Sequence, residues 1–152
     1  MIVFVCRANR FRSPLAAACF RKELVERKMD SGWQVLSAGT GGTGRLPPLS
    51  AAVDEAGRRG MDISEHASHG VHEEHIMAAD LVIVMEQRQK EALQMEFPES
   101  AGKVYLLSEA AVGKKFDIPD PGRWTSAADI TNAIERLIHD GFDRICALME
   151  AG

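Results

Sequence analysis

Four short apolar runs, separated by segments with helical patterns, constrain the fold of this chain most strongly. The runs are rich in Val and Ile and are bounded by polar or turn residues, as buried strands are; they cover residues 2–6, 34–37, 81–85 and 104–107. Strands that alternate with helices form a parallel sheet with helices on both faces. We therefore predict an α/β fold, with a four-stranded parallel sheet, in a single domain over residues 1–152. That length can bury a proper core.

Helical patterns lie between and after these runs. Apolar side chains recur every four residues along 14–29, a second helix is predicted after Pro47-Pro48, and a third over 87–96. The final pattern is the strongest, and it consists of Ile130, Ile134, Leu137, Ile138, Ile145, Leu148 and Met149. The segments 39–50 and 113–126 are rich in turn residues and are predicted to be loops. Ligands of open α/β sheets bind beyond the carboxyl ends of the strands, where Cys6, Ser37 and the loop after 104–107 are expected.

The first run ends in the sequence VCRANRFRSP, which combines a thiol, an arginine and a helix start. The backbone N–H groups of such a turn and the helix N-terminus form a cradle for an anion. The planar fork of Arg12 can grip two phosphoryl oxygens. Positive surroundings favour a thiolate, so Cys6 is a candidate nucleophile toward a phosphorus ester. The alternative is a small buried apolar cysteine before a helix with Ser13 as N-cap and Pro14 in first position.

A second motif, DIPDP, spans residues 117–121 and contains Asp117 and Asp120. Transfer of a phosphoryl group to sulfur leaves an oxyanion that needs a proton. A carboxylic acid on a facing loop can supply that proton, worth about 10²–10⁴-fold, and can later act as base for the hydrolytic water. Asp-Pro is also ordinary turn chemistry, so this motif by itself is weak.

Four histidines, His66, His69, His72 and His75, are spaced three residues apart. No nearby cysteine or regular acidic partner completes a coordination set, so a solvated face is favoured over a metal site. We expect no metal and no organic cofactor.

The composition restricts the class of protein. The net charge of −4 argues against a general nucleic-acid binder. No apolar stretch approaches the roughly 20 residues of a membrane span. The three cysteines, at positions 6, 19 and 146, fit no zinc or disulfide framework. We expect a cytoplasmic monomer with no integral membrane segment and no nucleic-acid partner.

Taken together, the motifs resemble the low-molecular-weight protein tyrosine phosphatases over essentially the whole chain. They are VCRANRFRSP, SAGT at 37–40, Pro47-Pro48, MDISEHAS at 61–68, DLVIVM at 80–85 and DIPDP at 117–121. The resemblance implies a four-stranded parallel sheet flanked by helices. It also implies hydrolysis of phosphotyrosine in phosphorylated protein substrates through a phosphocysteine intermediate.

The same resemblance implies roles for individual residues. Cys6 is the nucleophile, Arg12 clamps the phosphate and Asp120 is the general acid. The phosphate-binding loop consists of Arg7, Ala8, Asn9, Arg10, Phe11, Arg12 and Ser13. Hydrogen bonds that shape this loop are expected from Asn9, Ser13, Ser37 and His66. The walls of the substrate site are assigned to Arg7, Arg10 and Trp124.

The chain departs from the family pattern at several positions. Ala8 stands where the family has glycine, which is costly if the position needs a positive φ. Phe11 replaces a second loop cysteine, so oxidised Cys6 should lack a local disulfide rescue. Arg7 and Arg10 replace apolar wall residues. Four alternatives therefore stay open beside phosphotyrosine hydrolysis: phosphoarginine, an anionic small phosphomonoester, arsenate reduction, and a non-catalytic phosphate-binding module.

Overall fold

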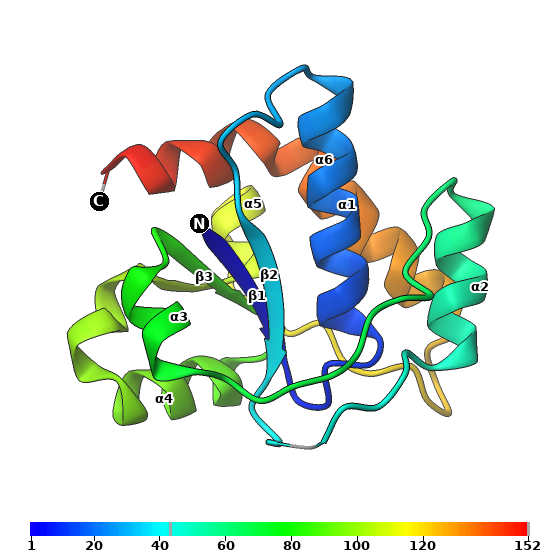
Figure 1. Cartoon of the computed structure of the whole chain (residues 1–152), viewed down its shortest axis with the longest axis horizontal. Coiled ribbons are helices and arrows are strands. Elements are labelled where there is room, and N and C mark those ends of the chain that lie inside the picture. Colours follow the sequence, from blue (N-terminus) through cyan, green and yellow to red (C-terminus); the bar gives the residue numbers. More distant parts are fainter. Residues whose placement is uncertain (43, 152) are drawn as a thin grey trace.

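The strand order of the central sheet is β2-β1-β3-β4, and all neighbouring strands are parallel (Figure 1). The structure, a computed structural model, describes residues 1–42 and 44–151. The strands are β1 (Ile2–Cys6), β2 (Val35–Gly39), β3 (Leu81–Val84) and β4 (Val104–Leu106). Cys6 pairs in register with Gly39 and ends an interior strand. The predicted parallel sheet is confirmed, and it places Cys6 at a carboxyl edge where ligands bind.

Helices cover both faces of this sheet (Figure 1). One face is covered by α1 (Arg12–Glu26), α5 (Leu107–Val112) and α6 (Ala127–Ala151), and α2 (Ser50–Arg58) packs against α1 and α6 on the same side. The other is covered by α3 (Glu73–Ala78), α4 (Gln87–Glu96) and the 3₁₀ helix η1 (Pro98–Lys103). Each face has its own buried apolar cluster. This double burial explains why the strands are continuous apolar runs instead of alternating ones.

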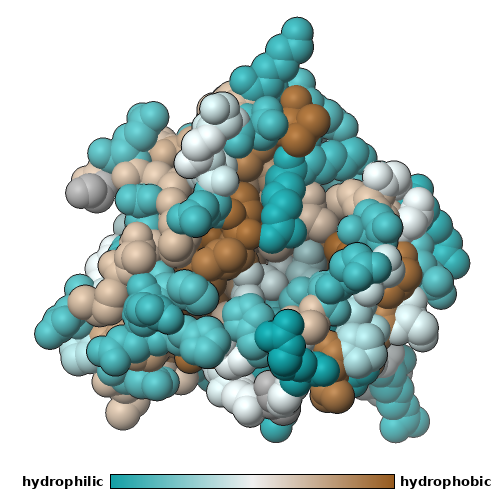
Figure 2. Space-filling model, in the orientation of Figure 1, coloured by the Kyte–Doolittle hydropathy of each residue, from teal (hydrophilic) through white to brown (hydrophobic). Residues whose placement is uncertain are grey.

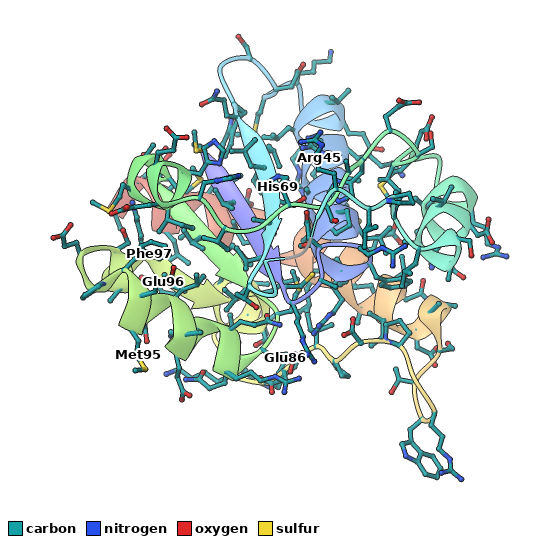
Figure 3. The ribbon with its side chains drawn as sticks, turned by 60° about the horizontal axis from the view of Figure 1, so that its bottom comes forward. Arg45, His69, Glu86, Met95, Glu96 and Phe97 are labelled. Carbon is teal, nitrogen blue, oxygen red and sulfur yellow. The ribbon has the colours of Figure 1, made fainter. Side chains whose placement is uncertain are left out.

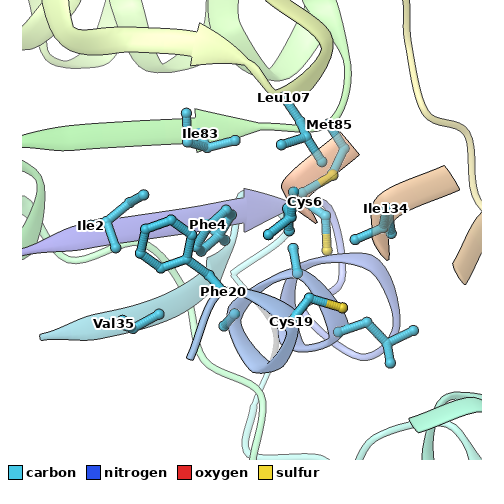
Figure 4. Packing of buried hydrophobic residues seen from close by; sticks show 14 of the residues in the cluster. Ile2, Phe4, Cys6, Cys19, Phe20, Val35, Ile83, Met85, Leu107 and Ile134 are labelled. Atoms are coloured by element: carbon cyan, nitrogen blue, oxygen red, sulfur yellow. The ribbon is translucent and has the colours of Figure 1, made fainter. Parts of the chain in front are cut away.

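Aromatic packing joins β1, α1 and α6 in the larger cluster, and Figure 4 shows Phe4 and Phe20 within it. The Phe20 ring centroid lies 5.7 Å from that of Phe4 and 5.3 Å from that of Phe142. Trp33 packs edge-on against Phe20 at 5.3 Å. Each fully buried phenylalanine contributes about 1.5–3 kcal/mol relative to exposure. These contacts hold α1 firmly on β1, and therefore hold the connection between them.

Several boundaries differ from the sequence-based expectation. The helices α3 and α5 were not expected, and Leu107 begins α5 instead of ending a strand. Helix α1 begins at Arg12, with Phe11 as its N-cap, so Ser13 is not the cap that the alternative interpretation of this motif assigned to it. The reason is that the Ser13 hydroxyl faces the thiol of Cys6 and the amide of Asn9. The predicted loops 39–50 and 113–126 contain mostly irregular structure; Thr43, within the first, and Gly152 lie outside the described residues.

Hydrophilic side chains cover most of the face that Figure 2 shows, and hydrophobic ones gather near the edge strand β2. Within residues 1–42 and 44–151, no helix has the length and apolar character needed to cross a membrane.

Candidate functional site

The loop from Cys6 to Ser13 links β1 to α1 and is held from outside by its carbonyl groups. The carbonyl oxygens of Cys6, Arg7 and Arg10 accept hydrogen bonds from backbone N–H groups within 40–49, at 2.9, 2.8 and 3.0 Å. The backbone N–H groups of the loop are less fully bonded than its carbonyl groups. Several loop N–H groups donate to no acceptor among the described residues, namely those of Arg7, Ala8, Arg10 and Phe11. A loop with bonded carbonyls and available N–H groups is suited to an anion.

The Cys6 thiol sits against two polar groups of the same loop. Its Sγ lies 3.0 Å from the Ser13 Oγ and accepts a hydrogen bond from the Asn9 backbone N–H at 3.3 Å. Cys6 is only 2% exposed. The Ser13 hydroxyl and the Asn9 N–H are thus both placed to donate a hydrogen bond to the sulfur.

Asn9 organises the loop through its side chain and its backbone. Its Nδ2 donates to the Ser13 Oγ at 2.8 Å and to the Ser37 Oγ at 3.0 Å. Its carbonyl oxygen lies 2.8 Å from the His66 Nε2. The structure thus brings together all four residues of the expected supporting network. The Asn9 Oδ1 also accepts a hydrogen bond from the His69 backbone N–H at 3.1 Å, a contact that sequence reasoning missed.

The positive φ of the loop falls on Asn9, at 58°, and not on Ala8. Asparagine tolerates this left-handed region better than most residues do. The expected strain at Ala8 is therefore absent, and the alanine is accommodated without the cost considered above.

Burial lowers the pKa of His66, and the hydrogen bond to the Asn9 carbonyl only partly offsets this.

Arg12 is buried at 1% exposure and is surrounded by acceptors. One terminal nitrogen donates to the Glu86 carboxylate and to the Ile118 carbonyl, the latter at 2.7 Å. The other donates to the Asp120 Oδ2 at 3.0 Å. The Nε lies 3.0 Å from the Asp120 Oδ1, yet its N–H forms no hydrogen bond with any described residue because the angle is poor. One donor of the buried guanidinium therefore remains available.

Glu86 is the residue that sequence reasoning missed. It lies two residues after Val84, the last residue of β3, at the same carboxyl edge as Cys6 (Figure 3). Burial alone would raise the pKa of Glu86, but hydrogen bonds and charge from Arg12, then from Arg88, outweigh it and lower the pKa. A charged residue directly after the apolar run 81–85 was the available signal.

A cleft of about 340 Å³ opens at this loop, and its lining includes both the expected nucleophile and the expected general acid. It is lined by Cys6, Ala8, Arg10, Phe11, Leu49, Ala51, Asp120 and Pro121. Arg10 is fixed at its edge by a 2.8 Å hydrogen bond from Nε to the Pro47 carbonyl. The other two expected wall residues lie elsewhere: Arg7 lines a neighbouring hollow, and Trp124 is 89% exposed and lines neither.

The histidine series forms no coordination set. His69 and His72 stack with ring centroids 5.5 Å apart, and His72 meets His75 edge-on at 5.4 Å. Among the described residues, no three His, Cys, Asp or Glu side chains are arranged to hold a metal ion.

Comparisons with known proteins agree with this geometry. The model of the family "Low molecular weight phosphotyrosine protein phosphatase" matches residues 1–151. A probable low molecular weight protein-tyrosine-phosphatase, EpsP, of Ralstonia nicotianae is 35% identical over 97% of each chain. A protein-arginine-phosphatase of Bacillus subtilis is 32% identical over 79% of this chain and 78% of its own.

Comparison with solved structures shows the same relationship in the fold. The low molecular weight protein tyrosine phosphatase of T. tengcongensis superposes with a TM-score of 0.85 at 29% identity, covering 94% of this chain and 97% of that one. A mutant of YwlE from Bacillus subtilis gives a TM-score of 0.80 at 30% identity, covering 91% and 93%. The chain therefore belongs to the low molecular weight phosphotyrosine protein phosphatase family.

Proposed function

We propose that this protein hydrolyses phosphotyrosine in proteins through a phosphocysteine intermediate. The observation that carries the proposal is the position of the Cys6 thiol and the Asp120 carboxyl in one cleft, with Arg12 between loop and acid. Binding a phosphate would require neither a thiol nor an acid, so this combination favours catalysis over a binding module.

In the first step, the Cys6 thiolate attacks phosphorus and the bond from phosphorus to the tyrosine oxygen breaks. Asp120 gives its proton to the departing phenolate. The loop N–H groups and the Arg12 guanidinium hold the three remaining phosphoryl oxygens, where negative charge is spread in the transition state.

In the second step, water attacks the phosphocysteine and the bond from sulfur to phosphorus breaks. Asp120, now a carboxylate, takes a proton from the water. Inorganic phosphate leaves, and the thiolate is regenerated. The Ser13 hydroxyl, 3.0 Å from the Cys6 Sγ, stabilises the departing thiolate.

Phosphoarginine is the second candidate substrate, because a relative 32% identical is named a protein-arginine-phosphatase. The loop argues for tyrosine. Arg10 lines the cleft, and its positive charge repels a substrate that itself carries a guanidinium. The neutral ring of phosphotyrosine can instead stack on an arginine plane.

The test is steady-state hydrolysis of p-nitrophenyl phosphate, a phosphotyrosine peptide and a phosphoarginine peptide, without added metal. We expect turnover of the first two, abolished by Cys6→Ser while phosphate binding is retained. Asp120→Ala should slow turnover by about 10²–10⁴-fold with poor leaving groups and much less with activated esters. Asp117→Ala is the matched control, because Asp117 instead accepts the Gln87 backbone N–H at 2.8 Å. Equal slowing of good and poor leaving groups by Asp120→Ala would refute the acid role.

We also propose that residues 1–152 form one phosphatase domain that works as a monomer in the cytoplasm. All three cysteines are free thiols, which supports a reducing compartment.

A further inference from the structure

We propose that a hollow beside the phosphate loop, lined by Arg7 and Arg88, is a subsite for an acidic side chain near the phosphorylated residue. The proposal rests on the proposed function and adds a preference among protein substrates. The hollow measures about 300 Å³ and is lined by Arg7, Thr40, Gly41, Arg88, Gln89 and Ala92. None of these six described residues is acidic.

The hollow is directly connected to the catalytic loop. The backbone of Arg7 is part of that loop, and Arg7 also lines the hollow. The other wall is tied to the same loop, since Thr40 N–H donates to the Cys6 carbonyl at 2.9 Å and Gly41 N–H donates to the Arg7 carbonyl at 2.8 Å. Because Arg7 directly follows Cys6 in the chain, a substrate with its phosphorylated residue at Cys6 can place a residue close in sequence at this hollow.

Positive charge at the hollow is only partly neutralised. Arg88 lies 3.0 Å from the Glu86 Oε2, but the other oxygen of Glu86 already serves Arg12. Glu86 thus contacts two guanidinium groups, of which Arg12 also pairs with Asp120, while Arg88 has Glu86 alone within the described part of the chain. Arg7 has no acidic partner within 4.0 Å among the described residues. The surplus charge attracts an anion although the whole chain has a net charge of −4.

Gln89 adds an amide group to the lining of the hollow. It is 3% exposed, and its Oε1 accepts the backbone N–H groups of Met85 and Glu86, each at 3.0 Å. Its amide is oriented by those bonds, and its buried Nε2 has no acceptor among the described residues. Buried donors are normally satisfied. A carboxylate suits this lining, because it accepts only, and binds a guanidinium fork in a bidentate way.

The experiment compares kcat/KM for phosphotyrosine peptides that differ only in the flanking residues. Pairs of Glu, Gln or Lys are placed either before or after the phosphotyrosine. We expect Glu to exceed Gln by about fivefold on one side, with Lys lowest, since exposed ion pairs are worth up to about 1 kcal/mol each. Arg7→Gln and Arg88→Gln should each bring the Glu to Gln ratio toward one. Arg136→Gln removes the same charge from a separate hollow between α1 and α6 and should leave the ratio unchanged.

Two readouts separate this proposal from the proposed function. p-Nitrophenyl phosphate has no flanking residues, so its turnover reports on the catalytic centre alone. An enzyme that hydrolyses it and the Gln peptide, but shows equal kcat/KM for Glu and Gln on both sides, overturns the subsite and keeps the phosphatase. A Glu preference that survives both arginine variants also overturns the subsite. Loss of the preference at high ionic strength supports it.

Discussion

Glu86→Gln is the substitution that most directly tests how the site is held together. The Arg12 and Glu86 side chains are 1% and 10% exposed, so the variant leaves a buried guanidinium with less compensation. Removal of one partner from a buried pair costs about 3–5 kcal/mol. The Ile118 carbonyl and Asp120 carboxylate remain with Arg12, and the glutamine oxygen still accepts one bond. We therefore expect a loss of about 2–3 kcal/mol in the free energy of unfolding.

The same variant should change how stability depends on pH. In the folded protein the pKa of Glu86 lies below its ordinary value, so its stabilisation is present above the unfolded pKa and is lost as pH falls through the folded pKa. The difference in unfolding free energy between wild type and Glu86→Gln should therefore be largest at neutral pH and shrink on acidification. Turnover of p-nitrophenyl phosphate should also fall, because Arg12 loses a fixed partner.

Urea denaturation followed by circular dichroism, at neutral pH and at about pH 4, measures both effects. Glu26→Gln is the matched control, because Glu26 is 55% exposed and lies 3.9 Å from Lys22; it should change stability by less than about 0.5 kcal/mol. A loss at Glu86→Gln no larger than the control's, or a difference that does not vary with pH, would refute the reasoning.

Three further predictions follow from other parts of the molecule. The hydrogen bond from His139 to Glu23, and then the charge of Glu23, raise the pKa of His139. The stability advantage of the wild type over His139→Gln should therefore shrink as pH rises from about 6 to about 9. A difference in thermal unfolding that stays constant over this range would count against the pair. Gly39→Ala places a Cβ 2.6 Å from the Arg7 carbonyl oxygen, so we expect about 1–3 kcal/mol of destabilisation and weaker phosphate binding by calorimetry; wild-type values in both would contradict the tight approach. Peroxide should inactivate Cys6 in a manner that a reductant reverses only in part, because the loop has no second thiol, and full recovery of activity would exclude this.

The sheet and the long helices could be predicted because each carries a sustained apolar pattern. The final helix, α6 (Ala127–Ala151), repeats its pattern over many turns and packs along α1 and α5. Helices α3 and α5 have six residues each, too few for a period of 3.6 to emerge. Leu107 shows the resulting ambiguity, since an apolar residue after a strand can extend the strand or begin a helix.

The candidate site was predictable where its residues are contiguous in sequence or belong to recognisable motifs. Cys6 to Ser13 form one loop, and the motifs containing Ser37 and His66 were each distinctive. Glu86 was missed because its contact with Arg12 spans 74 residues and depends on the two strand ends meeting at one edge. The place of Trp124 could not be predicted, since no local pattern specifies where an exposed loop directs its side chain.

The ion pair between Arg12 and Asp120 makes substrate binding an exchange of counterions. A phosphoryl group that reaches the guanidinium competes with a carboxylate that belongs to the protein itself. A monoanion gains little from such an exchange, whereas a dianion brings twice the charge, so the resting pair acts as a filter for fully ionised esters.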